Sequence, residues 1–227
     1  MGRWNVVALV GLVLLGGMDA AHAGTVRLLD RNIEVVLPDG YCEMRERFVD
    51  PQGIARSRSA TGNTTVELTR FAHCQEMREV ESGRRKELDR FGTLAVQARS
   101  GQPVLVPGMP RSGFLEKLSA DRSSYNAWLA DSERSLQRVA PGFRIERNLG
   151  YFRTDAYGTY SGFVAKIPGA EKRQDMTAIL TGTTLVREFI AVVTLGRAYR
   201  SENSLQRHMQ ELQTAVLQLV RANDPAP

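Results

Sequence analysis

The sequence predicts an α+β fold, in which helices pack on a mainly antiparallel sheet. Short runs with the two-residue period of a strand occur in pairs separated by turn residues, as in antiparallel hairpins. Two longer runs place their apolar residues on one helical face. The order along the chain is strands, helices, strands and helix, which is typical of α+β domains. We expect a single domain over residues 24–222.

The first 23 residues have the pattern of a secretory signal peptide. Arg3 supplies a positive charge, the apolar run 6–17 follows, and the tripeptide AHA at 21–23 places small residues where signal peptidase reads them. This apolar run is shorter than the roughly 20 residues that span a bilayer. We therefore predict cleavage before Gly24, a periplasmic or secreted protein, and no transmembrane segment after cleavage. An uncleaved membrane anchor is the alternative.

Four strands and one short helix are predicted in the first half of the mature chain. Alternating or β-branched residues place the strands at 25–30, 32–37, 64–71 and 93–98. Asp50 and Pro51 are typical N-cap and first-turn residues, so we expect a helix at 50–59. The segment 100–111 is rich in proline and glycine and is a possible linker.

Two helices and two hairpins are predicted after this segment. A short helix surrounds Phe114, and a longer one at 122–139 carries an apolar face. The hairpin strands are expected at 143–154, 159–167, 175–181 and 184–195. The second hairpin would turn at Gly182-Thr183. Its last strand contains the apolar run FIAVVTL, so we expect this strand to be central and covered on both faces.

An amphipathic helix is predicted at the C-terminus, from 202 to 222, with Ser201 as its N-cap. Its apolar residues share one face: Leu205, Met209, Leu212, Val216 and Leu219. We expect this face to dock on the sheet. The last residues, 223–227, are expected to form a disordered tail.

The chain has two cysteines, Cys42 and Cys74, and both follow predicted strands. Export would bring them to an oxidising compartment, where they allow one disulfide, worth about 3 to 4 kcal/mol. The catalytic alternative makes Cys74 a nucleophile activated by His208, because the adjacent His73 points away from Cys74 on a strand or helix. No metal site is expected, since CxxC and HExxH spacings are absent. We predict the disulfide, with His73 as a bystander.

Aromatic and charged residues concentrate in the predicted hairpin YFRTDAYGTY. The candidate binding surface consists of Tyr151, Arg153, Asp155, Tyr157 and Tyr160. Arginine and aromatic residues suit a saccharide or peptide partner. The alternative, which we favour, is that the rings are buried in the sheet and that Asp155 only shapes the turn. If Arg153 faces Tyr160 across the hairpin, Tyr151 shares a face that is typical of core.

The sequence carries no GxSxG elbow, Walker loop or GxGxxG fingerprint, so we assign no catalytic residue and no cofactor. The net charge is +5, and the basic residues are spread along the chain, so we expect no nucleic-acid partner. We predict a soluble, non-catalytic binding or interaction module of the cell envelope, with an envelope protein or a saccharide as partner. The alternative is a periplasmic hydrolase whose site is assembled from scattered residues.

Three short motifs, LPDGYC at 37–42, FAHC at 71–74 and GRRKELDRFG at 83–92, resemble those of a group of uncharacterised exported proteins from alphaproteobacteria. This resemblance covers the first half of the mature chain and departs from the group's pattern at Asp39. The order of elements is also remotely similar to that of PsbP/Mog1-like α/β/α sandwiches. The resemblance implies a periplasmic domain without known chemistry, and it brings no catalytic residues.

Overall fold

The computed structural model describes residues 22–48, 64–167 and 176–224. It confirms the predicted α+β class: a mainly antiparallel sheet with a C-terminal helix packed on it. The strands are β1 His22–Leu28, β2 Arg31–Val36, β3 Tyr41–Glu43, β4 Thr65–His73, β5 Arg90–Arg99, β6 Gln102–Pro103, β7 Arg144–Thr154, β8 Thr159–Lys166, β9 Met176–Val186 and β10 Phe189–Ala198. The helices are α2 Cys74–Glu81, α3 Arg111–Ala120, α4 Arg122–Val139 and α5 Glu202–Asn223, with a 3-10 turn, η1, at Glu46–Phe48.

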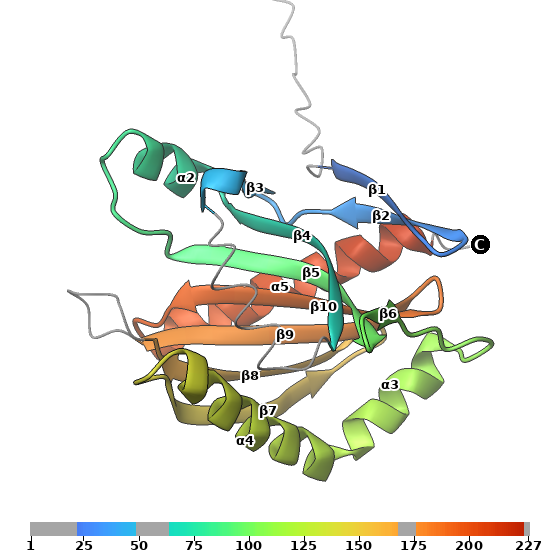
Figure 1. Ribbon diagram of the computed structural model, residues 1–227. Coiled ribbons are helices and arrows are strands. Elements are labelled where there is room, and N and C mark those ends of the chain that lie inside the picture. Colours follow the sequence, from blue (N-terminus) through green and yellow to red (C-terminus); the bar gives the residue numbers. More distant parts are fainter. Residues whose placement is uncertain (1–21, 49–63, 168–175, 225–227) are drawn as a thin grey trace, which may run out of the picture.

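An eight-stranded sheet forms the centre of the molecule, in the order β3-β4-β5-β10-β9-β8-β7, with β6 paired to β5. The strands β1 and β2 form a separate two-stranded sheet. In Figure 1, α5 lies behind the large sheet, whereas α3 and α4 lie in front of it. The helix α5 packs on β9, β10 and β2, and α4 packs on β7.

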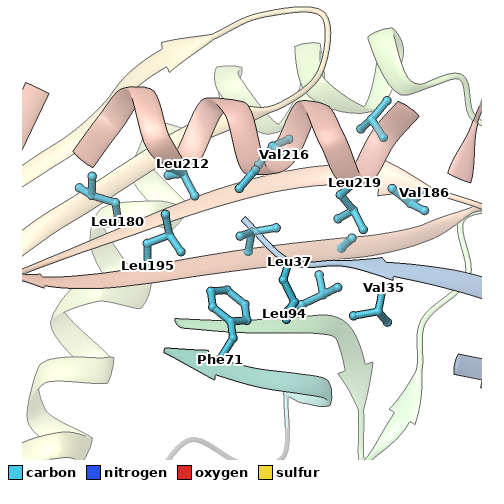
Figure 2. Packing of buried hydrophobic residues seen from close by; sticks show 14 of the residues in the cluster. Val35, Leu37, Phe71, Leu94, Leu180, Val186, Leu195, Leu212, Val216 and Leu219 are labelled. Carbon is cyan, nitrogen blue, oxygen red and sulfur yellow. The ribbon is translucent and has the colours of Figure 1, made fainter. Parts of the chain in front are cut away.

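The core lies between α5 and the sheet. Figure 2 shows Leu212, Val216 and Leu219 of α5 above the side chains of β9 and β10. On β10, alternate residues from Phe189 to Leu195 are fully buried, while the residues between them are half-buried. The predicted central position of β10 is confirmed. The prediction that both of its faces are covered is wrong, because buried and half-buried residues alternate along β10, as in a strand with one fully buried face.

Local signals explain the confirmed start and docking of α5. The Ser201 side chain accepts from the Ser204 backbone N–H, and the Ser204 side chain accepts from the Ser201 N–H, which forms a capping box. Buried residues recur along one face of the helix from Leu205 to Val220. Among the described helices, none is long and apolar enough to cross a bilayer.

The predicted turn at Gly182-Thr183 is wrong. Gly182 lies inside β9, and the chain instead turns at Arg187 and Glu188, which both adopt positive φ angles, of 49° and 67°. The glycine serves packing, because a Cβ at position 182 would lie 2.5 Å from Val216 Cγ2. Gly182 therefore lets α5 approach β9 closely, so this glycine has a packing role and not a turn role.

Several predicted boundaries also change. The possible linker 100–111 is bonded to the sheet, since Leu105 bridges Phe189 and the Val106 N–H donates to the Glu188 carbonyl at 2.9 Å. Asn223, assigned to the disordered tail, is the fully buried last residue of α5. The predicted helix at 50–59, and the signal peptide up to residue 21, lie outside the described residues.

Candidate functional site: a charged cluster beside the disulfide

A disulfide joins Cys42 of β3 to Cys74, the first residue of α2, and confirms the predicted bond. The two Cα atoms lie 5.1 Å apart, because β3 pairs with the end of β4. The Cys74 sulfur is therefore not available as a thiolate, and the catalytic pairing of Cys74 with His208 is excluded. The bond holds the edge strand β3 and the start of α2 together.

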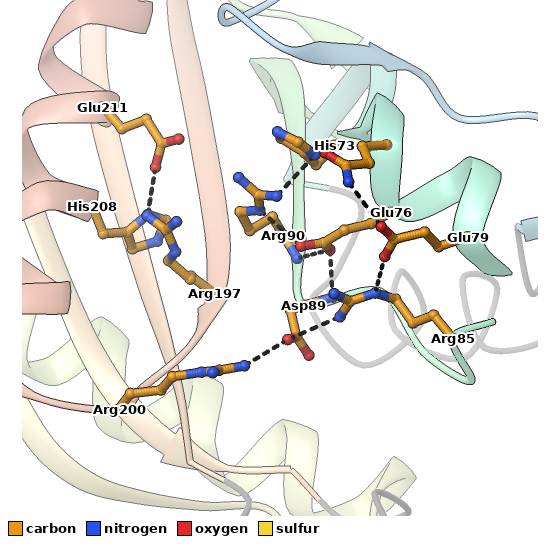
Figure 3. Close-up of polar contacts among 11 residues, drawn as sticks. His73, Glu76, Glu79, Arg85, Asp89, Arg90, Arg197, Arg200, His208 and Glu211 are labelled. Carbon is orange, nitrogen blue, oxygen red and sulfur yellow. Dashed lines mark hydrogen bonds and ion pairs between the residues drawn. The ribbon is translucent and has the colours of Figure 1, made fainter.

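Ionisable side chains from six elements gather near this disulfide, where β4 and β10 end and β5 begins. We call them the charged cluster: Tyr41, His73, Glu76, Arg90, Arg197, His208 and Glu211. Figure 3 shows the α5 residues His208 and Glu211 beside Arg197, and the group of His73, Glu76 and Arg90 opposite them.

Two arginines face each other in the cluster, because Arg90 of β5 and Arg197 of β10 are register partners. Like charges directly opposite each other destabilise a sheet unless they are compensated. Here each arginine has its own carboxylate: Arg90 Nε donates to Glu76 at 2.8 Å, and Arg197 Nη1 donates to Glu211 at 3.0 Å. Two ion pairs from separate helices thus neutralise the arginine pair.

Glu76 is the most enclosed carboxylate of the cluster, with 4% of its surface exposed. Its Oε2 accepts from the backbone N–H groups of Asp89 at 2.8 Å and Arg90 at 3.0 Å, and its Oε1 accepts from Arg90 Nε. The carboxylate is therefore fully bonded, as a buried charge requires. It anchors the start of β5 to α2.

His73 accepts a hydrogen bond from Arg90. Arg90 Nη2 lies 2.9 Å from His73 Nδ1, and since a guanidinium only donates, Nδ1 is the acceptor and the neutral ring carries its proton on Nε2. Burial, followed by Arg90, lowers the pKa of His73 below its ordinary value. The prediction that His73 is a bystander missed this contact within the cluster.

Two fully buried polar atoms of the cluster have no hydrogen-bond partner among the described residues: Tyr41 Oη and His208 Nδ1. Burial, reinforced by Glu211, raises the pKa of the Tyr41 phenol despite the nearby arginines, so this group stays protonated. Burial alone would raise the pKa of Glu211, but His208, Arg197 and Arg90 together hold it below its ordinary value. The cluster thus combines the charged carboxylate of Glu211 with two buried polar atoms that have no hydrogen-bond partner among the described residues.

A second row of charges surrounds the cluster on its solvent side. Asp89 accepts from Arg85 Nη1 and Arg200 Nη2, each at 3.1 Å, and Arg85 Nε also donates to Glu79 at 3.0 Å. Arg200 is mostly exposed, whereas Asp89 is mostly covered. The result is a row in which both signs of charge alternate in fixed positions, with Arg200 as the member most exposed to solvent.

The structure separates the predicted binding surface on the hairpin β7–β8. Tyr160 is fully buried, so it cannot contact a partner, and its place in that surface was wrong because its ring belongs to the core under α5. Arg153 does face Tyr160 in the register, as expected. Tyr151 and Tyr157 are half-buried, and only Arg153 is clearly exposed. The rings are thus largely buried, as the favoured alternative predicted.

Asp155 shapes the loop of this hairpin. Its Oδ1 accepts from the backbone N–H groups of Tyr157 at 2.8 Å and Gly158 at 3.1 Å, and from Tyr160 Oη at 3.3 Å. These bonds form a turn in which the aspartate side chain replaces a backbone acceptor. The carboxylate therefore supports the fold of the loop.

A depression of about 310 Å³ lies elsewhere, near the turn between β9 and β10. It is lined by Met109, Arg111, Leu185, Arg187, Glu188 and Asp224. Arg111 already donates to the Leu185 carbonyl at 3.0 Å and pairs with Asp224. This bonding makes the depression a less attractive site than the charged cluster.

In the described part of the chain, no group of three or more histidine, cysteine or acidic residues is placed to hold a metal ion. Comparison with known proteins adds no family: no family model and no curated protein matches the sequence. The site must therefore be interpreted from its own geometry.

Proposed function

We propose that the chain is an exported binding module of the bacterial cell envelope, working in the periplasm or outside the cell. The observation that carries this proposal is the Cys42–Cys74 disulfide, since such bonds persist in oxidising compartments and are rare in the cytosol. The signal-peptide pattern of residues 1–23 supports the same location. The resemblance to exported alphaproteobacterial proteins agrees with it.

The binding surface in this proposal is the row of charges around the charged cluster. Arg85, Asp89 and Arg200 hold one another in place, so a partner would meet charges that are already ordered. Because both signs alternate, a protein with complementary charges fits this surface better than a nucleic acid does. We therefore favour an envelope protein over a saccharide as the partner.

A photoreactive amino acid at position 200, introduced into the full chain in cells, tests this surface. The matched control is the same amino acid at position 131 of α4, since Arg200 and Asp131 have side chains that are 66% and 74% exposed. The proposal predicts a specific cross-linked protein at position 200 only, and an affinity of the purified pair that falls with added salt. Equal cross-linking at both positions, or an affinity that salt leaves unchanged, would contradict it.

The second candidate is a hydrolase, which the convergence of Tyr41, His73 and Glu76 from separate elements favours. Two contacts weigh against it: the Nδ1 lone pair of His73 is engaged by Arg90, and Glu76 is buried and fully bonded. A general base needs a free acceptor within reach of its substrate. Hydrolysis of ester, peptide or glycan substrates by the purified chain, lost in His73→Gln, would favour this candidate over the binding module.

A further inference from the structure

His208 is, with Tyr41, one of two fully buried titratable groups of the charged cluster. It lies on α5 with none of its surface exposed, and its Nε2 is 3.2 Å from the Leu195 backbone carbonyl of β10. A carbonyl oxygen only accepts, so Nε2 carries a proton in this contact. The imidazole thus links α5 to β10 through one ring nitrogen.

The other ring nitrogen faces a carboxylate. His208 Nδ1 lies 3.5 Å from Glu211 Oε2 and has no hydrogen-bond partner among the described residues. In the neutral ring with its proton on Nε2, Nδ1 presents a lone pair to this negative charge, which is unfavourable. A proton on Nδ1 would turn the same contact into a charge-assisted hydrogen bond.

Glu211 is the acidic group nearest to Nδ1, and it already accepts from Arg197 of β10. The other titratable or charged groups of the cluster are Tyr41 of β3, His73 of β4, Glu76 of α2 and Arg90 of β5. Arg90 is matched by Glu76 and Arg197 by Glu211, and Tyr41 is neutral, so a cation at His208 would share Glu211 with Arg197.

We propose that His208 and Glu211 form a proton-operated clamp between α5 and β10. Uptake of one proton from solvent at His208 Nδ1 creates the Nδ1–H to Oε2 bond, and Glu211 is then held by both Arg197 and His208. The Glu211 side chain is 28% exposed, so a proton can reach the buried ring along this carboxylate. The clamp does not depend on the proposed binding function.

A double-mutant cycle in the mature chain tests the clamp, using His208→Gln, Glu211→Gln and the pair. Urea unfolding gives the equilibrium constant of each variant at pH 8 and at pH 5.5. We expect a favourable coupling between the two positions of about tenfold at pH 5.5, and at pH 8 a coupling that is absent or unfavourable, because the neutral ring presents a lone pair to the carboxylate. Equal coupling at both values would overturn the proposal. Asp131→Asn, which removes an exposed carboxylate on α4, should leave the pH dependence unchanged.

A second measurement keeps the test decisive if His208→Gln does not fold. Nitrogen-15 NMR of the imidazole rings in the unaltered mature chain reports the position of each ring proton, and only His73 and His208 remain after the predicted cleavage. The clamp predicts that the neutral ring of His208 carries its proton on Nε2, and that a second proton, taken up as the solution is acidified, is held on Nδ1 while the chain is still folded. A proton on Nδ1 in the neutral ring, or a ring that takes up no second proton before the chain unfolds in acid, would refute it.

Discussion

Replacing Gly182 by alanine should destabilise the protein through a clash with α5. The new Cβ would lie 2.5 Å from Val216 Cγ2 and 3.4 Å from Leu212 Cδ1, and the first of these distances is too short for any real contact. Overpacking of this kind costs about 1 to 3 kcal/mol. Because the clash is with one methyl group, Val216→Ala should relieve it, and the double variant should lose less stability than the two single losses added together.

Urea unfolding followed by circular dichroism measures these free energies. Gly113→Ala is the matched control, since its Cβ would meet only Pro110, at ordinary contact distances. Because alanine favours a helix more than glycine does, this variant should raise the free energy of unfolding by up to about 1 kcal/mol. Strict additivity of Gly182→Ala and Val216→Ala would refute the packing role and point back to a turn or backbone role for this glycine.

Three further predictions concern the core and its polar edges. Leu212→Ala removes a fully buried side chain and should cost about 2 to 5 kcal/mol in urea unfolding, whereas the exposed Gln210→Ala should cost almost nothing; equal small losses would show that α5 does not dock. Asn223→Ala leaves the N–H and C=O groups of Glu34 without their side-chain partners and should lower the unfolding free energy by about 1 to 3 kcal/mol; an unchanged midpoint would mean that this lock between α5 and β2 is not formed. Because the folded pKa of His73 is lowered, its stabilising contribution is present above the unfolded pKa of about 6.5 and is lost as pH falls towards the folded pKa, so the cost of His73→Gln should shrink between pH 7 and pH 5; a cost that grows would reverse the sign.

Patterns carried by neighbouring residues predicted most of the helices and strands. The N-cap Ser201 and the apolar face that follows it specify α5 by local interactions, and the structure begins the helix where expected. The turn between β9 and β10 was missed because Arg187 and Glu188 carry no turn signature, although both adopt positive φ angles. Glycine is a common turn residue, but Gly182 is needed because α5, which is distant in sequence, packs too closely on this position for a Cβ to fit.

The candidate site could likewise be predicted only in part. Cys42 and Cys74 could be paired because the chain offers each cysteine one partner. The charged cluster could not be predicted, since the opposition of Arg90 and Arg197 depends on the register of two strands. The contact of His208 with Leu195 likewise requires the docking geometry of α5. Long-range register and packing carry no local sequence signal.

The central claim is that the chain is exported and that a disulfide fixes the edge beside the charged cluster. Intact mass of the full-length gene product, isolated from bacteria and alkylated before any reduction, tests both parts in one experiment. The account predicts a chain that begins at Gly24, takes up no alkyl group without reduction, and takes up two after reduction of the Cys42–Cys74 bond. A chain that keeps residues 1–23, or one that takes up two alkyl groups before reduction, would contradict it.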